Sequence, residues 1–243
     1  MIRLRQVVKA FREPLLQGID AELPKGEVWG LVGPAASGKS VLLKLICGLY
    51  QADSGEVEVG GERVTGADEQ ALMKVRTRIG MLFQNNALFD FMNVLENVAF
   101  PLVRAGVPRA EAEERAAGRL RKVGLGGSEH KQPGQLSGGM KKRVGIARAS
   151  IANPELVIYD EPTAGLDPVT TSKIYDLLRA DQEATGATVI AVSSDVDSLL
   201  RFTRRTAMLH GGRLRYDGPS AEMADSSDPV VRQFVRGDLE GPL

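Results

Sequence analysis

Residues 28–40 have the sequence VWGLVGPAASGKS, and this stretch decides the fold. Its first six residues form a short apolar run that ends in glycine, which is typical of a strand, and KSVLLKLICGL (39–49) predicts a helix. Strand, glycine-rich turn and helix in this order begin an α/β unit. The turn GPAASGKS (33–40) fits the pattern G-x-x-x-x-G-K-S in the context that this pattern requires.

The turn has the residues that a phosphate-binding loop needs. Gly33 and Gly38 allow the backbone to turn so that successive N–H groups point at one anion, and the helix N-terminus adds partial positive charge. Lys39 can reach the β- and γ-phosphates, and the Ser40 hydroxyl can bind Mg²⁺. A glycine-rich connection without a ligand would not need this combination. The predicted nucleotide-binding residues of this loop are Gly33, Pro34, Ala35, Ala36, Ser37, Gly38, Lys39, Ser40 and Val41.

A second apolar run ends in two carboxylates. LVIYDE (156–161) places Asp160 and Glu161 directly after four apolar residues. A phosphate loop needs a carboxylate at a neighbouring strand end for the metal, which suits Asp160. Glu161, one residue further, could take a proton from a water that attacks the γ-phosphate. Acidic residues at a strand end often only form turns, but the phosphate loop in the same chain favours the catalytic interpretation.

The order of predicted elements outlines the domains. IRLRQVVKAF and LLQGIDAEL near the N-terminus predict strands, as does GEVEVGGERV (55–64) with a glycine turn. From about residue 86 to 150 the chain becomes rich in Ala, Glu, Arg and Leu, which predicts a helical lobe. Strand and helix patterns then resume to about residue 220. The tail DPVVRQFVRGDLEGPL (228–243) has no obvious place in this core.

The most specific segment is QLSGGMKKRVGIARASI (135–151). Ser137, Gly138 and Gly139 precede a helix whose apolar positions Met140, Val144, Ala147 and Ile151 fall on one face. Taken alone, this is a common helix start. It is nevertheless a second anion-binding helix N-terminus, and the first already has its phosphate. An LSGG-type signature between a phosphate loop and a strand-end Asp-Glu pair resembles the ATP-binding cassette (ABC) ATPases.

This resemblance implies a fold and a dimeric mechanism. The implied fold is an α/β P-loop NTPase core (1–85 and 151–220) with an N-terminal antiparallel β subdomain, an inserted α-helical subdomain (about 86–150) and a C-terminal extension (221–243). In the family, two cassettes pair head to tail, and each signature caps the γ-phosphate on the partner's loop. The implied homodimer would therefore bind ATP and Mg²⁺ at sites that both chains share.

Further residues gain roles only from the resemblance. Gln84 matches the glutamine that touches the metal and senses the transporter, so the implied metal ligands are Ser40, Gln84 and Asp160. Phe11 matches the aromatic residue that stacks on adenine, although an apolar Phe at a strand end is a real alternative. Asp167 in AGLDP matches the aspartate that crosses to the partner's site. The chain has no N-K-x-D motif for reading guanine, which favours ATP over GTP.

The composition fits an ATPase that acts at a membrane through partners. Lys plus Arg and Asp plus Glu both number 31, so the formal net charge is zero. The protein as a whole therefore has no net positive charge that would attract nucleic acid or an anionic membrane. The single cysteine, Cys47, suits a reducing compartment, and its apolar setting predicts a buried thiol. Arg3, Arg5 and Lys9 argue against a signal peptide, and no run of 18 apolar residues predicts a membrane span. We expect a cytoplasmic protein that is peripheral on the inner face of the cell inner membrane.

Three passages are similar to the ATPases of MCE-type lipid transporters, of which the Mla phospholipid pathway is the best known. They are GMLFQNNALFDFMNVLENVAFPL (80–102), LSGGMKKR with Met140 where most ABC signatures have glutamine, and the C-terminal tail. The similarity implies phospholipid transport with permease subunits, an MCE-domain lipid-binding protein and a small STAS-type accessory subunit. Another ABC importer or exporter remains an alternative. Leu88, Phe89, Phe91 and Met92 would either fill the helical lobe or accept a permease helix.

The strand ATVIAV (187–192) ends in an unusual residue. ABC ATPases usually have histidine in a pattern such as V-[ST]-H-D, and here Ser194 occupies the histidine's place in VSSD (192–195). His130 and His210 are not in register to substitute for it. Serine has a shorter reach and is never cationic. Ser194 therefore puts turnover in doubt but not ATP binding, and a dimerisation switch with weak hydrolysis is a further alternative.

Overall fold

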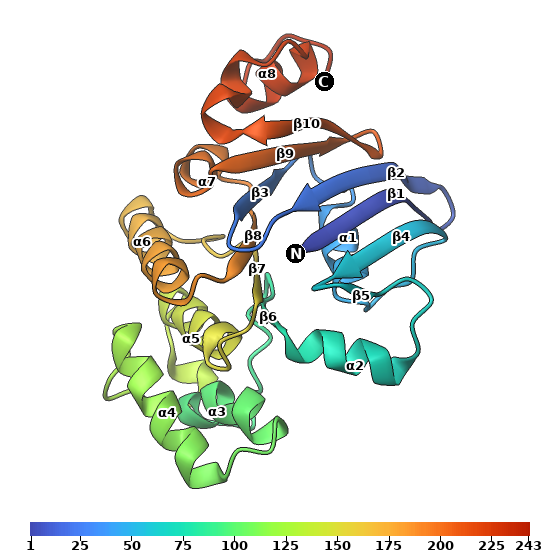
Figure 1. Ribbon diagram of the computed structural model, residues 1–243. Coiled ribbons are helices and arrows are strands. Elements are labelled where there is room, and N and C mark those ends of the chain that lie inside the picture. Colours follow the sequence, from blue (N-terminus) through green and yellow to red (C-terminus); the bar gives the residue numbers. More distant parts are fainter. The chain divides into compact units, whose positions relative to one another are not determined.

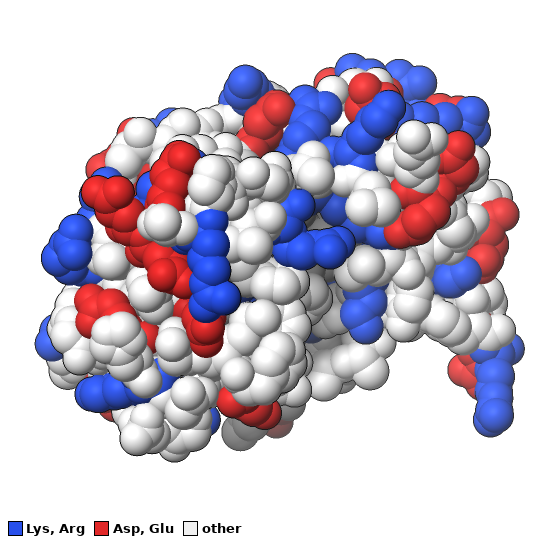
Figure 2. Space-filling view, turned by 90° about the horizontal axis from the view of Figure 1, so that it is seen from below, with Lys and Arg blue, Asp and Glu red and all other residues white.

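The computed structural model describes residues 1–243 and divides into two compact units. The first unit contains residues 1–78 and 188–243, and the second contains residues 79–187. The protein is mixed α/β, and Figure 1 shows its strands and helices in sequence colours. On the face shown in Figure 2, basic and acidic side chains are interspersed among other residues, in keeping with the equal numbers of both.

The first unit carries an antiparallel sheet in the order β2-β1-β4-β5 and the strands β10-β9-β3-β8. Its elements are β1 (Ile2–Ala10), β2 (Pro14–Leu23), β3 (Val28–Val32), α1 (Lys39–Ile46), β4 (Ser54–Val59), β5 (Glu62–Arg63), α2 (Glu69–Thr77), β8 (Thr188–Val192), α7 (Val196–Phe202), β9 (Arg205–His210), β10 (Arg213–Pro219), the 3₁₀ helix η2 (Ser220–Asp225) and α8 (Pro229–Arg236).

The central strands of the first unit are parallel, and strands of parallel sheets are typically covered on both faces. β3 pairs in parallel with β8 and with β9, and every residue of β3 and β8 is buried. Continuous apolar runs are typical of such strands. The predicted N-terminal strands, the hairpin at Gly60-Gly61 and the helix after the phosphate loop are confirmed.

The second unit combines two parallel strands with four α-helices. Its elements are β6 (Ile79–Leu82), α3 (Val94–Arg104), α4 (Arg109–Lys122), the 3₁₀ helix η1 (Pro133–Gln135), α5 (Gly138–Ser150), β7 (Leu156–Asp160) and α6 (Pro168–Thr185). β6 pairs with β7, with Leu82 opposite Tyr159. In Figure 1, α3, α4 and α5 lie together, coloured green to yellow.

One apolar cluster holds α3, α4 and α5 together. Val98, Leu102, Ala116, Leu120 and Val144 all belong to it and are almost fully buried. The predicted apolar face of the signature helix is confirmed, since Val144, Ala147 and Ile151 lie in the cluster and Met140 packs against it. Burial of this face accounts for the helical character of the region between residues 86 and 150.

The C-terminal tail has a place that the sequence did not reveal. Val231 of α8 is fully buried and Val230 nearly so. Asp228 caps α8 by accepting from the backbone N–H of Val230, and Arg215 of β10 donates twice to its carboxylate, at 2.8 and 3.1 Å. α8 therefore packs on the first unit beyond β10 (Figure 1). None of the helices combines the length and apolar character that crossing a membrane requires.

Candidate functional site

The phosphate loop has a backbone conformation with positive φ angles that favour glycine. Gly33 has φ of 146°, and a Cβ there would collide with the carbonyl oxygen of Leu209. Gly38, with φ of 103°, is the N-cap of α1. Ala36, between them, also has a positive φ of 60°. The repeated left-handed residues turn the chain sharply into the helix, as an anion-binding loop requires.

Two polar groups of this loop fit a phosphate ligand. The Lys39 ammonium donates to the carbonyl oxygens of Gly33 and Pro34, at 2.7 and 2.9 Å, so it lies over the loop. The Ser37 hydroxyl is buried and has no hydrogen-bond partner. A buried hydroxyl without a partner is costly, and an anion seated in the loop could accept its hydrogen bond. The loop is thus suited to the phosphates of a nucleotide.

Ser194 lies at the same sheet edge as the start of the phosphate loop. In the parallel pair of β3 and β8, Leu31 is opposite Val192. Gly33 and Ser194 each follow their partner by two residues, so both leave the sheet at its carboxyl edge. Ser194 is exposed, and Asp195 behind it caps α7 by accepting from the N–H of Ser198 at 3.1 Å. In open α/β sheets, ligands bind at this edge.

Phe11 is not a core residue. It follows β1 in the first unit, and 59% of its surface is exposed. Its ring meets the edge of Tyr50 with centroids 5.8 Å apart, and the Lys9 ammonium lies 5.4 Å from its centroid. An exposed ring braced in this way has a face available for stacking on a planar ligand.

In the second unit, the carboxylates and Gln84 lie at one sheet edge. Leu82 of β6 is opposite Tyr159 of β7, so Gln84 and Glu161 each follow the paired ends by two residues. Asp160 is buried at the last position of β7. Glu161 has a positive φ of 53°, which is unfavourable for a residue with a Cβ and marks a constrained turn.

Lys142 was not identified from the sequence, yet it joins these two loops. Its ammonium donates to the backbone oxygens of Gln84 and Glu161, both at 2.8 Å, from the middle of α5. Burial lowers the pKa of Lys142, while the charges of Glu161 and Asp160 oppose this shift. The spacing of Lys142, Gly145 and Ala149 is the sequence signal that could have revealed a second buried face of α5.

The signature and Asp167 each begin a helix of the second unit. Ser137 is the N-cap of α5 and accepts from the N–H of Met140 at 3.3 Å, and Ser137 and Gly138 are exposed. Asp167 is the N-cap of α6 and accepts from the hydroxyl and the N–H of Thr170, at 2.6 and 2.9 Å. The hydrogen bond from the Thr170 hydroxyl is the main cause that lowers the pKa of Asp167. Both helix starts are open to a further ligand or chain.

The loop after Gln84 is held firmly by buried polar groups. The fully buried Asn97 accepts from the N–H of Phe89 at 2.8 Å and donates to the oxygens of Phe89, Met92 and Asn93, each at 3.0 Å. Arg148 of α5 donates to the oxygens of Ala87 and Asn86, at 2.7 and 2.6 Å. The backbone of this loop is therefore fixed, and it holds the loop's apolar side chains in place.

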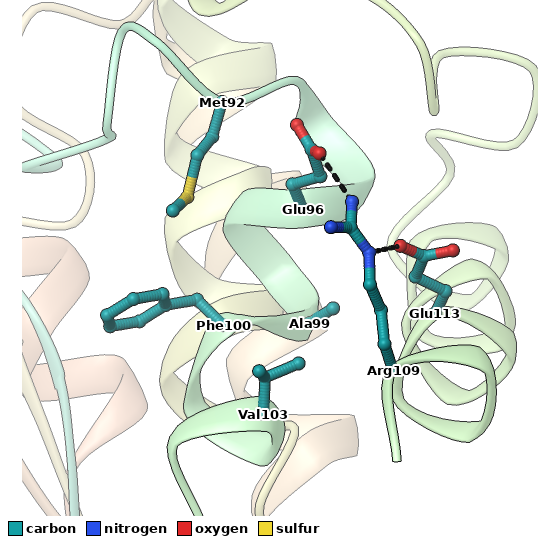
Figure 3. A pocket seen from close by; sticks show the side chains of 7 residues that line it. All are labelled: Met92, Glu96, Ala99, Phe100, Val103, Arg109 and Glu113. Atoms are coloured by element: carbon teal, nitrogen blue, oxygen red, sulfur yellow. Dashed lines mark hydrogen bonds and ion pairs between the residues drawn. The ribbon is translucent and has the colours of Figure 1, made fainter. Parts of the chain in front are cut away.

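Those side chains divide between the core and the surface. Leu88 packs against the helical cluster, whereas Phe91 is 79% exposed. Met92 lines a pocket with Ala99, Phe100 and Val103 of α3, and Arg109 bridges Glu96 and Glu113 at one side of it (Figure 3). Leu88 thus fills the helical lobe, as one half of the prediction has it, and docking of a permease helix at the exposed side chains stays a prediction.

Comparison with known proteins identifies the family. The sequence pattern of the ABC transporter family matches residues 16–164. This chain belongs to the ABC transporter family. It is similar to the protein TRIGALACTOSYLDIACYLGLYCEROL 3 of Arabidopsis thaliana, with 37% identity covering 100% of this chain and 75% of that protein. It is also similar to the methionine import ATP-binding protein MetN of Caulobacter vibrioides, with 39% identity covering 100% and 74%.

Solved structures of similar proteins support the assignment of this chain to the ABC family. A dimeric ATP-binding cassette in a post-hydrolysis state, bound to ADP and Pi, has 33% identity and a TM-score of 0.83, covering 90% of this chain and 99% of that one. The protein cbiO1 from Clostridium perfringens, part of the ABC transporter complex cbiONQ, has 29% identity and a TM-score of 0.84, covering 98% and 95%. The predicted fold is confirmed. The chain is an ATPase subunit of the ABC type, and its family binds ATP with Mg²⁺.

Proposed function

We propose that this chain is the ATPase subunit of an MCE-type transporter that moves phospholipid, acting at the cytoplasmic face of the membrane. The observation that carries the ATPase part is the phosphate loop, in which Lys39 and the unpartnered Ser37 hydroxyl fit a nucleotide's phosphates. The lipid part rests on the segment 80–102, the signature LSGGMKKR and the C-terminal tail. The relative from Arabidopsis, whose name contains that of a galactolipid, supports it.

The catalytic roles follow from family membership and from the chemistry of each residue. The backbone of residues 33–41 and Lys39 would bind the phosphates, while Phe11 would stack on the base. Ser40, Gln84 and Asp160 would hold Mg²⁺, which supplies charge neutralisation at the β- and γ-phosphates. Glu161 would accept the proton of the attacking water, with Ser194 as a weak donor in place of histidine.

A second copy of the chain would complete each site. ABC ATPases act as dimers with membrane permease subunits. In the proposed head-to-tail dimer, the signature residues Ser137, Gly138 and Gly139 of one chain cap the γ-phosphate on the other chain's loop. Asp167 would reach across to the partner's site. The N-terminus of α5, with no acidic residue in its first turn, suits an anion.

The permease would dock on the loop after Gln84. Met92 lines the pocket beside α3 (Figure 3), and the exposed Phe91 precedes it in a backbone segment that Asn97 fixes. A short apolar helix from a permease could cover these side chains. Gln84 begins the same loop, so this loop would connect the docked permease to the metal site. An MCE-domain protein and a STAS-type subunit would complete the complex.

Nucleotide binding can be tested on the isolated chain. Mg-ATP at one hundred times its dissociation constant should stabilise the fold by about 2.7 kcal/mol through linkage. The melting temperature of the parent should rise with Mg-ATP, whereas that of Lys39→Ala should not. A parent that does not shift at millimolar nucleotide would contradict the proposal.

The lipid assignment needs the membrane complex. The chain should co-purify with a permease and an MCE-domain protein, and the reconstituted complex should transfer fluorescent phospholipid between vesicles only with ATP. The Glu161→Gln variant is the control and should transfer none. A second candidate function, small-molecule import, is favoured by the similarity to MetN. Methionine-stimulated ATP hydrolysis without lipid transfer would decide for it.

A further inference from the structure

The signature helix α5 is buried on a second face besides its apolar one. A Cβ at Gly145 would collide with the Leu82 side chain of β6, and a Cβ at Gly80 would collide with the Ala149 carbonyl oxygen. The backbones of α5 and β6 therefore approach closely, as only glycine allows. Lys142 precedes Gly145 by one turn on this face, and only 4% of its surface is exposed. Its stem thus runs through the helix–strand interface.

The buried end of Lys142 contacts two functional loops at their backbone. The ammonium lies 2.8 Å from the oxygen of Gln84 and 2.8 Å from that of Glu161. Glu161 has an unfavourable positive φ, so a charge-assisted hydrogen bond to its carbonyl helps to hold that turn in place. The position of the Glu161 carboxylate depends on the same turn.

A second buried cation of α5 shows what is specific to Lys142. Arg148 also donates to backbone oxygens of the loop after Gln84, but its contacts are with Asn86 and Ala87. No described contact joins Arg148 to the turn at Glu161. Both cations therefore attach the loop to the signature helix, whereas Lys142 alone also reaches the turn that carries Glu161.

We propose that Lys142 is a positioning residue that couples the Glu161 turn of one ATP site to the signature that completes the other. The inference rests on the proposed head-to-tail dimer. In that dimer, Ser137 acts on the partner's nucleotide and Glu161 acts on the chain's own. Lys142 lies five residues after Ser137 on one rigid helix, about 7.5 Å along its axis. A signature engaged at one site thereby holds the Glu161 turn of the other site in place.

Three variants separate this role from mere packing. Lys142→Met keeps the length of the side chain and removes its donors, Lys142→Arg keeps donors, and Lys141→Met is a matched control one residue earlier. Lys142→Leu, which also lacks donors, replaces Lys142→Met if the latter does not fold. For each, we would measure kcat, the Hill coefficient for ATP and the melting temperature, together with the dissociation constant of a fluorescent ATP analogue.

The expected result is a loss of coupling without loss of binding. Lys142→Met should lower kcat by up to about a hundredfold, because a small displacement of the Glu161 carboxylate is costly to the reaction. It should also bring the Hill coefficient close to 1. The nucleotide dissociation constant should stay within about twofold. Lys142→Arg should recover most of kcat, and Lys141→Met should behave as the parent.

A readout independent of hydrolysis is the ATP-dependent dimer. In a Glu161→Gln background, which leaves the backbone oxygen in place, Lys142→Met should raise the ATP concentration for half-dimerisation by about tenfold. Unchanged kcat, Hill coefficient and dimerisation in Lys142→Met would overturn the inference while leaving the proposed function intact. So would a lower melting temperature with kcat and binding lost together and no recovery in Lys142→Arg. A parent that neither dimerises nor hydrolyses ATP would instead overturn the proposed function.

Discussion

At the residue scale, Ser194 is the departure from the usual ABC ATPase pattern that we expect to affect the rate of ATP hydrolysis most. It lies at the carboxyl edge of β8, in register with the phosphate loop, and is exposed. Losing one donor to a charged transition state costs about 3 kcal/mol, roughly a hundredfold in rate. The residue was found from the sequence because a strand pattern and a motif both fix its position.

We predict that Ser194→His raises ATP turnover in the assembled transporter by about tenfold to a thousandfold. An imidazole can supply the missing donor, and the gain should appear mainly in kcat because binding rests on other groups. Phosphate release at saturating ATP measures this. Glu161→Gln should abolish turnover in either background. A parent already as active as histidine-bearing relatives, with no gain in the variant, would mean that the site never lacked this donor.

Cys47 provides a second prediction at this scale. Burial raises the pKa of its thiol to about 12, so the folded protein keeps it neutral where the unfolded chain ionises, near pH 8.5. At pH 8, iodoacetamide should label the folded chain at least about a thousandfold more slowly than the unfolded chain, because the thiolate is the nucleophile. Equal labelling rates would contradict the predicted burial of this thiol.

The same shift has a consequence for stability. A raised folded pKa stabilises the fold fully below about pH 8.5, and this contribution is lost as the pH rises toward 12. Each pH unit in this window should lower the free energy of unfolding by about 1.4 kcal/mol through this thiol. Urea unfolding at pH 8 and pH 10 measures the slope, and Cys47→Ala should lack this part of it.

At the scale of elements, hydrophobic pattern predicted the strands and helices well. β3 and β8 consist of buried apolar residues with one glycine and one threonine, and the apolar face of α5 has clear helical spacing. The burial of Lys142 and Arg148 escaped the sequence because cations on a helix usually face solvent. The burial of Lys142 accompanies a close approach of β6 to α5, which the glycines at positions 80 and 145 allow.

The loop that follows Gln84 depends on one amide side chain. We predict that Asn97→Ala lowers the free energy of unfolding by about 2 to 3 kcal/mol, because it removes the fully buried side chain that pairs with the part-buried N–H of Phe89 and carbonyl oxygen of Met92. Urea unfolding measures the loss. Asn85→Ala, an exposed residue of the same loop, should change it by less than about 0.5 kcal/mol. Equal effects of both variants would refute the anchoring role of Asn97.

At the scale of the whole molecule, the sequence predicted the α/β fold but not the place of its tail. Motifs of the proposed ATP site are spread over the sequence from Phe11 to Ser194, and each lies at a strand end or a helix start. Such positions are marked by glycine, capping residues and carboxylates, which sequence patterns detect. The packing of α8 depends on Arg215 and Asp228, which lie 13 residues apart and carry no motif.

The central claim is that two chains close on ATP, each signature facing the other's phosphate loop. Light scattering on the Glu161→Gln variant tests it most directly, with Mg-ATP, without nucleotide and with Ser137→Arg added. We expect a mass of two chains only with Mg-ATP, and a mass of one chain when Ser137→Arg places bulk and charge against the partner's γ-phosphate. A Ser137→Arg dimer as tight as its parent, or a dimer that forms equally without ATP, would contradict this head-to-tail arrangement.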